Sequence, residues 1–153
     1  MCIRDSYRTA IVNPLVRNEE ILYQLNGMSM YSSTNTEEMW NFVKNMGFEN
    51  LENRFQYAGS TEVMDMLLGI RYLFCRNTRT LHTAYKKIAE SQSFDLYENP
   101  RALRSGYMVS DSVLDYAMEG TDPLEVQNRL LSGIVGKRLY KMQTVNSLSL
   151  IHI

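Results

Sequence analysis

Residues 59–74, GSTEVMDMLLGIRYLF, predict a helix, its end and a strand in immediate succession. Ser60 can cap the helix because its hydroxyl can accept from the first-turn amides, and Glu62 suits the positive end of the helix dipole. Gly69 is the residue type that most often ends a helix in a left-handed conformation. The apolar residues that recur at helical spacing are Val63, Met64, Leu67 and Leu68.

The sequence period changes after Gly69. Residues 70–75, IRYLFC, are rich in β-branched and aromatic types and predict a strand that leaves the helix directly. A helix tied this closely to a strand packs back onto its own sheet. We therefore expect an α+β domain, with short helices packed on a small sheet. We expect no transmembrane helix, because no apolar run has membrane-spanning length.

Both ends of the chain resemble translated sequencing adapter. Residues 1–6, MCIRDS, match the DNA ATGTGTATAAGAGACAG, which resembles a transposase mosaic end, and residues 148–153, LSLIHI, match its complementary strand. We expect these two segments to be adapter-derived and exclude them from fold reasoning. Residues 7–147 are then expected to be a single domain, part of a larger protein.

Composition excludes several classes of function. The formal net charge is −1, so the basic stripe of a nucleic-acid surface is missing and no nucleic-acid partner is expected. Between the two adapter-like ends the only cysteine and histidine are Cys75 and His82, which cannot form a disulfide framework or a Cys/His zinc site. We expect no metal and no cofactor.

Four further patterns predict elements on either side of the central stretch. Residues 19–25 suit a short helix or a strand before an Asn26-Gly27 turn. Thr34 with Glu37, or Asn35 with Glu38, has capping-box spacing before a helix that ends at Gly47. Segments 85–89 and 93–98 predict a hairpin that Asn99-Pro100 stops, and 106–109 a further short strand. Residues 111–118 suit one or two helical turns, and a last helix runs from an Asp122 cap to Gly136.

No residue pattern indicates catalysis. His82 stands alone without a neighbouring acid or nucleophile, and Cys75 ends a buried strand, where it serves as a small apolar residue. Glu62 with Asp65, and Asp111 with Asp115, have the spacing of solvated helix faces. We therefore expect no catalytic residue within this chain.

Five polar residues are the candidates for facing a substrate. Hydroxyls, amides and an aromatic ring suit sugar recognition, and capping or turn formation is the structural alternative for each. The candidates are Tyr31, Ser32, Ser33, Asn35 and Asn99.

Four groups of motifs, in order along the chain, carry a family resemblance. They are residues 26–34, residues 57–61 with 64–72, residues 97–103 with 106–109, and residues 122–128. Together they resemble the YfhO-type bacterial membrane proteins over most of residues 26–136.

The resemblance implies a multi-pass protein of the cell membrane, similar to GT-C glycosyltransferases that use lipid-linked sugars. Such a protein acts on cell-envelope polymers such as lipoteichoic acid, and its catalytic residues lie outside this chain. The chain is then an extracytoplasmic region whose partners are the membrane helices of the same parent chain, a lipid-linked sugar or an envelope polymer. The alternative is a free-standing α/β binding or interaction module without enzymatic activity.

Overall fold

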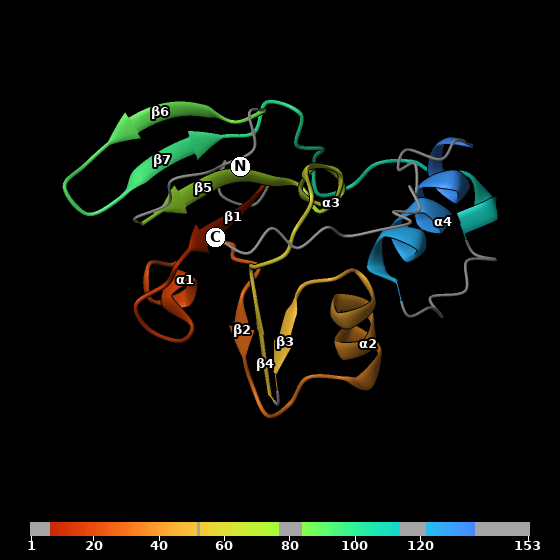
Figure 1. Cartoon of the computed structure of the whole chain (residues 1–153), viewed down its shortest axis with the longest axis horizontal. Coiled ribbons are helices and arrows are strands. Elements are labelled where there is room, and N and C mark those ends of the chain that lie inside the picture. Colours follow the sequence, from red (N-terminus) through yellow and green to blue (C-terminus); the bar gives the residue numbers. More distant parts are fainter. Residues whose placement is uncertain (1–6, 52, 77–83, 114–121, 137–153) are drawn as a thin grey trace, which may run out of the picture.

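The computed structural model describes residues 7–51, 53–76, 84–113 and 122–136. It confirms the α+β class (Figure 1). No helix in these ranges is long and apolar enough to cross a membrane. The elements in chain order are β1 (Arg8–Val12), α1 (Glu19–Leu22), β2 (Met30–Tyr31), α2 (Glu37–Asn45), β3 (Glu49–Leu51), β4 (Arg54–Gln56), α3 (Glu62–Leu67), β5 (Ile70–Cys75), β6 (Lys86–Glu90), β7 (Asp95–Glu98), the 3₁₀ helix η2 (Asp111–Val113) and α4 (Pro123–Val135).

The strands form two sheets. The larger has the order β1-β5-β7-β6, in which β1 runs parallel to β5 and the other neighbours are antiparallel. The smaller is antiparallel with the order β2-β4-β3. Because β1 and β5 are parallel neighbours, the chain between them must cross over, and this crossover carries the smaller sheet together with α1, α2 and α3.

The helix-to-strand junction has the predicted form. Gly69 has a φ of +68° and separates α3 from β5. A Cβ at this position would lie 2.8 Å from the carbonyl oxygen of Leu103, so both the backbone angle and the space favour glycine. The cap of α3 is one residue later than predicted, because Thr61 accepts from the Met64 amide at 3.3 Å.

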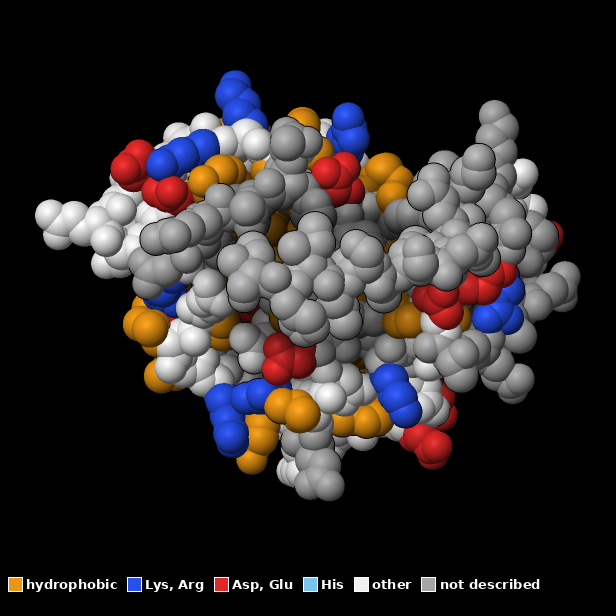
Figure 2. Space-filling view, viewed as in Figure 1, with side chains coloured by type: hydrophobic (Ala, Val, Ile, Leu, Met, Phe, Trp, Pro, Cys, Tyr) orange, Lys and Arg blue, Asp and Glu red, His pale blue; other side chains and the backbone are white. Residues whose placement is uncertain are grey.

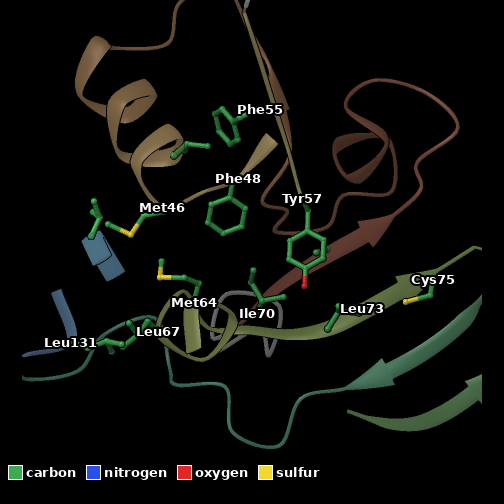
Figure 3. Packing of buried hydrophobic residues seen from close by; sticks show 13 residues of the cluster. Met46, Phe48, Phe55, Tyr57, Met64, Leu67, Ile70, Leu73, Cys75 and Leu131 are labelled. Atoms are coloured by element: carbon green, nitrogen blue, oxygen red, sulfur yellow. The ribbon is translucent and has the colours of Figure 1, made fainter. Parts of the chain in front are cut away.

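One apolar core joins the two sheets with α2, α3 and α4 (Figure 3). Its members come from β1, α2 and the residues after it, β4 and the residue after it, α3, β5 and α4, and include Met46, Phe48, Phe55, Tyr57, Met64, Leu67, Ile70, Leu73 and Leu131. Gln127 is 1% exposed and fixes α4 to this core. Its side chain donates to the Met46 carbonyl at 2.8 Å and accepts from the Thr61 hydroxyl at 2.9 Å.

The predicted hairpin and the two longer helices are present. Strands β6 and β7 pair as expected, and β7 ends directly before Asn99. Helix α4 begins after Asp122, whose carboxylate accepts from the Leu124 amide at 2.9 Å, and ends at Gly136. The cap of α2 is Thr36 rather than Thr34 or Asn35.

One predicted strand and one predicted turn were wrong. Residues 106–109 form no strand, since they pair with no strand of the described part of the chain, and Met108 is fully exposed. The turn expected at Asn26-Gly27 falls earlier, at residues 23–24, and Gly27 forms a parallel bridge with Thr9. The helical turn expected over 111–118 is described only as η2, and residues 114–118 lie outside the described residues.

Asp65 is buried instead of lying on a solvated helix face. It has no exposed surface, and its carboxylate accepts from the hydroxyls of Tyr57 at 2.6 Å, Ser60 at 2.5 Å and Tyr85. Burial, followed by the charge of Asp65, raises the pKa of both phenols. Ser60 therefore binds Asp65, while its neighbour Thr61 caps the helix.

We expect Gly69→Ala to lower the free energy of unfolding by about 2 kcal/mol, because alanine is strained in the left-handed backbone and meets the Leu103 carbonyl. Urea denaturation measures the change. Gly106→Ala is the matched control, since nothing lies within 4 Å of its Cβ position and its φ is not positive. Equal stability of the two variants would contradict this account of the junction.

Candidate functional site

A pocket of about 160 Å³ lies between the α1 segment and the smaller sheet. Three separate parts of the chain line it: residues 14–20, residues 29–31 and residues 54–56. The first part is the loop before α1 with the start of that helix, the second is Ser29 with β2, and the third is β4. The pocket thus forms only when the crossover between β1 and β5 has folded.

Glu20 joins α1 to β1 and to the segment before β2. Its side chain is buried, and its carboxylate accepts from the Ile11 amide at 3.0 Å and from the Ser29 amide at 2.8 Å. Burial raises the pKa of Glu20, and these hydrogen bonds oppose the rise. Gly27 leaves the room that Glu20 occupies, because a Cβ there would lie 2.4 Å from the Glu20 Oε2 atom.

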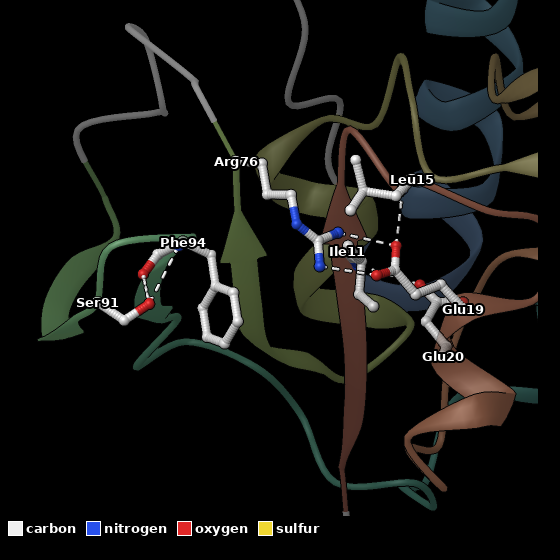
Figure 4. Close-up of polar contacts among 7 residues, drawn as sticks. All are labelled: Ile11, Leu15, Glu19, Glu20, Arg76, Ser91 and Phe94. Carbon is white, nitrogen blue, oxygen red and sulfur yellow. Dashed lines mark hydrogen bonds and ion pairs between the residues drawn. The ribbon is translucent and has the colours of Figure 1, made fainter.

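Glu19 forms a two-bond ion pair with Arg76, the residue that follows β5 (Figure 4). The two nitrogen-to-oxygen distances are 2.8 and 2.7 Å, and the Leu15 amide donates to the same carboxylate at 2.8 Å. The side chain of Glu19 is 3% exposed and that of Arg76 is 11% exposed. The hydrogen bond from Arg76 lowers the pKa of Glu19. The pair therefore holds the pocket wall against the larger sheet.

Asn18 holds Tyr31 at the side of the pocket. Its side chain accepts from the Tyr31 amide at 2.7 Å and donates to the Tyr31 carbonyl at 3.1 Å. The guanidinium of Arg17 lies 4.6 Å from the centre of the Tyr31 ring, a cation–π distance. Tyr31 stays 42% exposed, so its ring and hydroxyl remain accessible at the pocket.

The chemistry of the pocket suits a ligand with an anionic group and hydroxyls. Arg17, Arg54, Gln56 and Tyr31 line it with two guanidinium groups, an amide and a phenol. Glu19 and Glu20 also line it, and their carboxylates are bound by Arg76 and by backbone amides. The Arg54 guanidinium lies 3.4 Å from the Glu49 carboxylate on the surface. Guanidinium groups bind phosphate oxygens in a forked geometry, and aromatic rings pack on the apolar faces of sugars.

Four of the five predicted residues lie close together in sequence, within residues 31–35, but they do not share one pocket. Tyr31 lines the first pocket, whereas Ser33 and Asn35 line a second pocket of about 420 Å³ with Trp40. Ser32 bonds within the loop, to the Thr34 hydroxyl at 2.8 Å. Contact of these residues with a substrate stays a prediction.

Asn99 lies in a different part of the fold, after β7 of the larger sheet. It is 2% exposed, its side chain donates to the Ile70 carbonyl at 3.2 Å, and it accepts from the Arg101 amide at 3.0 Å. In the structure Asn99 therefore joins the end of β7 to β5.

Glu19, Glu20 and Arg76 were not among the candidates from sequence. Cys75 is buried at the end of β5, as expected, and His82 lies outside the described residues. Within the described ranges, no three His, Cys, Asp or Glu side chains are placed to hold a metal ion. The sequence signal for this site was two adjacent acids, Glu19 and Glu20, before the apolar residues Ile21 and Leu22. Arg76, the ion-pair partner of Glu19, is distant in sequence.

A family model described as bacterial membrane protein YfhO matches residues 4–152. Neither the curated proteins nor the solved structures contain a match to the chain.

We expect Arg76→Ala to destabilise the protein by about 3 kcal/mol at neutral pH, because it leaves the Glu19 carboxylate buried without its cation. The lowered pKa of Glu19 means that the ion pair contributes above the ordinary value of 4.5 and is lost as the pH falls through the lower folded-state pKa. The difference between variant and wild type should therefore shrink in acid. Urea denaturation across a pH range of about 3 to 7 measures it.

Arg101→Ala is the control for the buried pair. Its side chain is 68% exposed and lies 3.8 Å from Glu62, so we expect a change within about 0.5 kcal/mol at every pH. An Arg76→Ala penalty that does not depend on pH would show that packing, and not the charge of Glu19, carries the effect.

Proposed function

The chain belongs to the YfhO family of bacterial membrane proteins, whose model spans nearly its whole length, and we propose that it is an extracytoplasmic part of a multi-pass glycosyltransferase. In this proposal the enzyme is of the GT-C type. It transfers a sugar from a lipid-linked donor to a cell-envelope polymer such as lipoteichoic acid. The membrane helices of the same parent chain are the partners of this domain.

The observation that supports this proposal is the pocket beside Tyr31. A lipid-linked sugar presents a phosphate next to a ring of hydroxyls, and the pocket presents two guanidinium groups next to a phenol and an amide. Arg17 and Arg54 bind the phosphate in this proposal, and Tyr31 orients the sugar. The catalytic carboxylates belong to the membrane part of the enzyme, so this domain contributes binding and orientation.

Cysteine labelling tests on which side of the membrane the domain lies. Ser33 is exposed, so the full-length protein with Ser33→Cys should react with a membrane-impermeant maleimide in intact cells. Buried Cys75 is the internal control and should react only after unfolding. If the thiol introduced by Ser33→Cys reacts only in permeabilised cells, the domain lies in the cytoplasm and the proposal is refuted.

Substitutions in the pocket test its role in transfer. We expect Tyr31→Ala and Arg54→Ala each to lower sugar transfer by about tenfold, since each removes one contact to a charged or polar ligand group. The assay follows transfer from a short-chain polyprenyl phosphate carrying a radiolabelled hexose, in membranes that contain the full-length protein.

The chain offers a matched control for each variant. Tyr107 is 42% exposed, as Tyr31 is, but lies outside the pocket, and Arg101 is a surface arginine. Tyr107→Ala and Arg101→Ala should keep wild-type transfer. Equal losses in the pocket and control variants would contradict a binding role for the pocket.

A further inference from the structure

The α1 segment exposes a cluster of large apolar side chains. Figure 2 shows hydrophobic side chains at the edge of the molecule where α1 lies. Five apolar or aromatic residues of the segment are more than half exposed: Leu15 (76%), Val16 (51%), Ile21 (58%), Leu22 (69%) and Tyr23 (58%). Single exposed apolar residues are ordinary, but a group this dense in one short segment forms a patch that calls for a partner.

The polarity of this segment is reversed relative to an ordinary surface helix. Glu19 and Glu20 are 4% and 2% exposed, and they turn inward to Arg76 and to the amides of β1 and the segment before β2. Arg17 is the remaining charged residue of residues 13–24, and it is exposed. Asn13 and Gln24 are exposed amides at its two ends, and the outer surface between them is apolar with a single positive charge.

We propose that this surface, the α1 surface (Leu15, Val16, Arg17, Ile21, Leu22 and Tyr23), docks onto the headgroup region of a bilayer that contains anionic lipid. The chemistry fits that partner in three ways. Aliphatic side chains bury themselves at the boundary of headgroups and acyl chains, tyrosine suits the interface, and arginine pairs with lipid phosphates. Membership of a membrane-protein family places a bilayer within reach of the domain.

The α1 surface adjoins the pocket. Leu15, Val16 and Arg17 belong to both, so docking brings the pocket to the level of the lipid headgroups. A headgroup can then enter the pocket while its lipid stays in the bilayer. This consequence for the donor rests on the proposed function, whereas the docking itself does not.

Vesicle co-sedimentation of the full 153-residue chain tests the docking. The vesicles contain equal parts of phosphatidylglycerol and phosphatidylcholine and no sugar lipid, so the result is independent of glycosyl transfer. We expect the wild type to sediment with them and Ile21→Ser/Leu22→Ser to bind at least about tenfold more weakly. Arg17→Gln, which removes one positive charge, should weaken binding about fivefold, and vesicles of phosphatidylcholine alone should show no such difference.

Ile88→Ser/Met108→Ser is the control, because these side chains are 44% and 100% exposed but lie outside α1. It should bind as the wild type does, and circular dichroism with urea midpoints should show that all variants are folded. Three results would overturn the proposal: no sedimentation of the wild type, unchanged binding of Ile21→Ser/Leu22→Ser, or an equal loss in the control.

Discussion

The parallel pairing of β1 with β5 is the constraint on which the rest of the structure depends. Two strands that run in the same direction cannot be joined by a tight turn, so the chain between Val12 and Ile70 must leave the sheet and return. The smaller sheet, α1, α2 and α3 all belong to this crossover segment. The segment rejoins the larger sheet at Gly69, whose carbonyl accepts from the Arg8 amide at 2.8 Å. The residues that line the pocket all belong to this crossover segment, so the position of the pocket follows from the pairing of β1 with β5.

Buried carboxylates tie the crossover to the larger sheet. Glu19 forms an ion pair with Arg76, which follows β5, and Glu20 accepts a hydrogen bond from the Ile11 amide of β1. Asp65 accepts hydrogen bonds from the hydroxyls of two tyrosines and a serine. Each acid costs free energy to bury, and its donors offset that cost only when the whole fold is in place. These contacts therefore favour one arrangement of the sheets over looser alternatives. They also leave the outer side of α1 without negative charge, which gives the domain a surface suited to an anionic bilayer.

Elements with strong local signals could be predicted from the sequence. Gly69 and Gly136 mark helix ends, Asp122-Pro123 marks a helix start, and Asn99-Pro100 stops a strand, because each acts through its own backbone or through neighbours within a few residues. The exact capping residues were less predictable, because Ser60 and Thr61 are adjacent and both can cap a helix. In the structure the Ser60 hydroxyl donates to Asp65, and Thr61 is the residue that caps α3. Burial of the three acids was not predictable, because most of their donors lie outside the neighbouring helical turn: Arg76 is 57 residues from Glu19, Ile11 and Ser29 are each nine residues from Glu20, and Tyr57 and Tyr85 are eight and 20 residues from Asp65. The pocket was found only through Tyr31.

Gly27 links the architecture of the pocket to how this family can vary. The Glu20 side chain, from its Cβ to its carboxylate, fills the space that a side chain at position 27 would need. Side chains at positions 20 and 27 would therefore occupy the same space, and the residue at one position limits the size of the residue at the other. The Glu20 Cβ would itself lie 2.5 Å from a Cβ at position 27, so even alanine at position 20 would leave too little room, and relatives that keep this backbone should keep glycine at position 27. Free variation at position 27 beside an unchanged glutamate would show that the backbone around α1 differs among members.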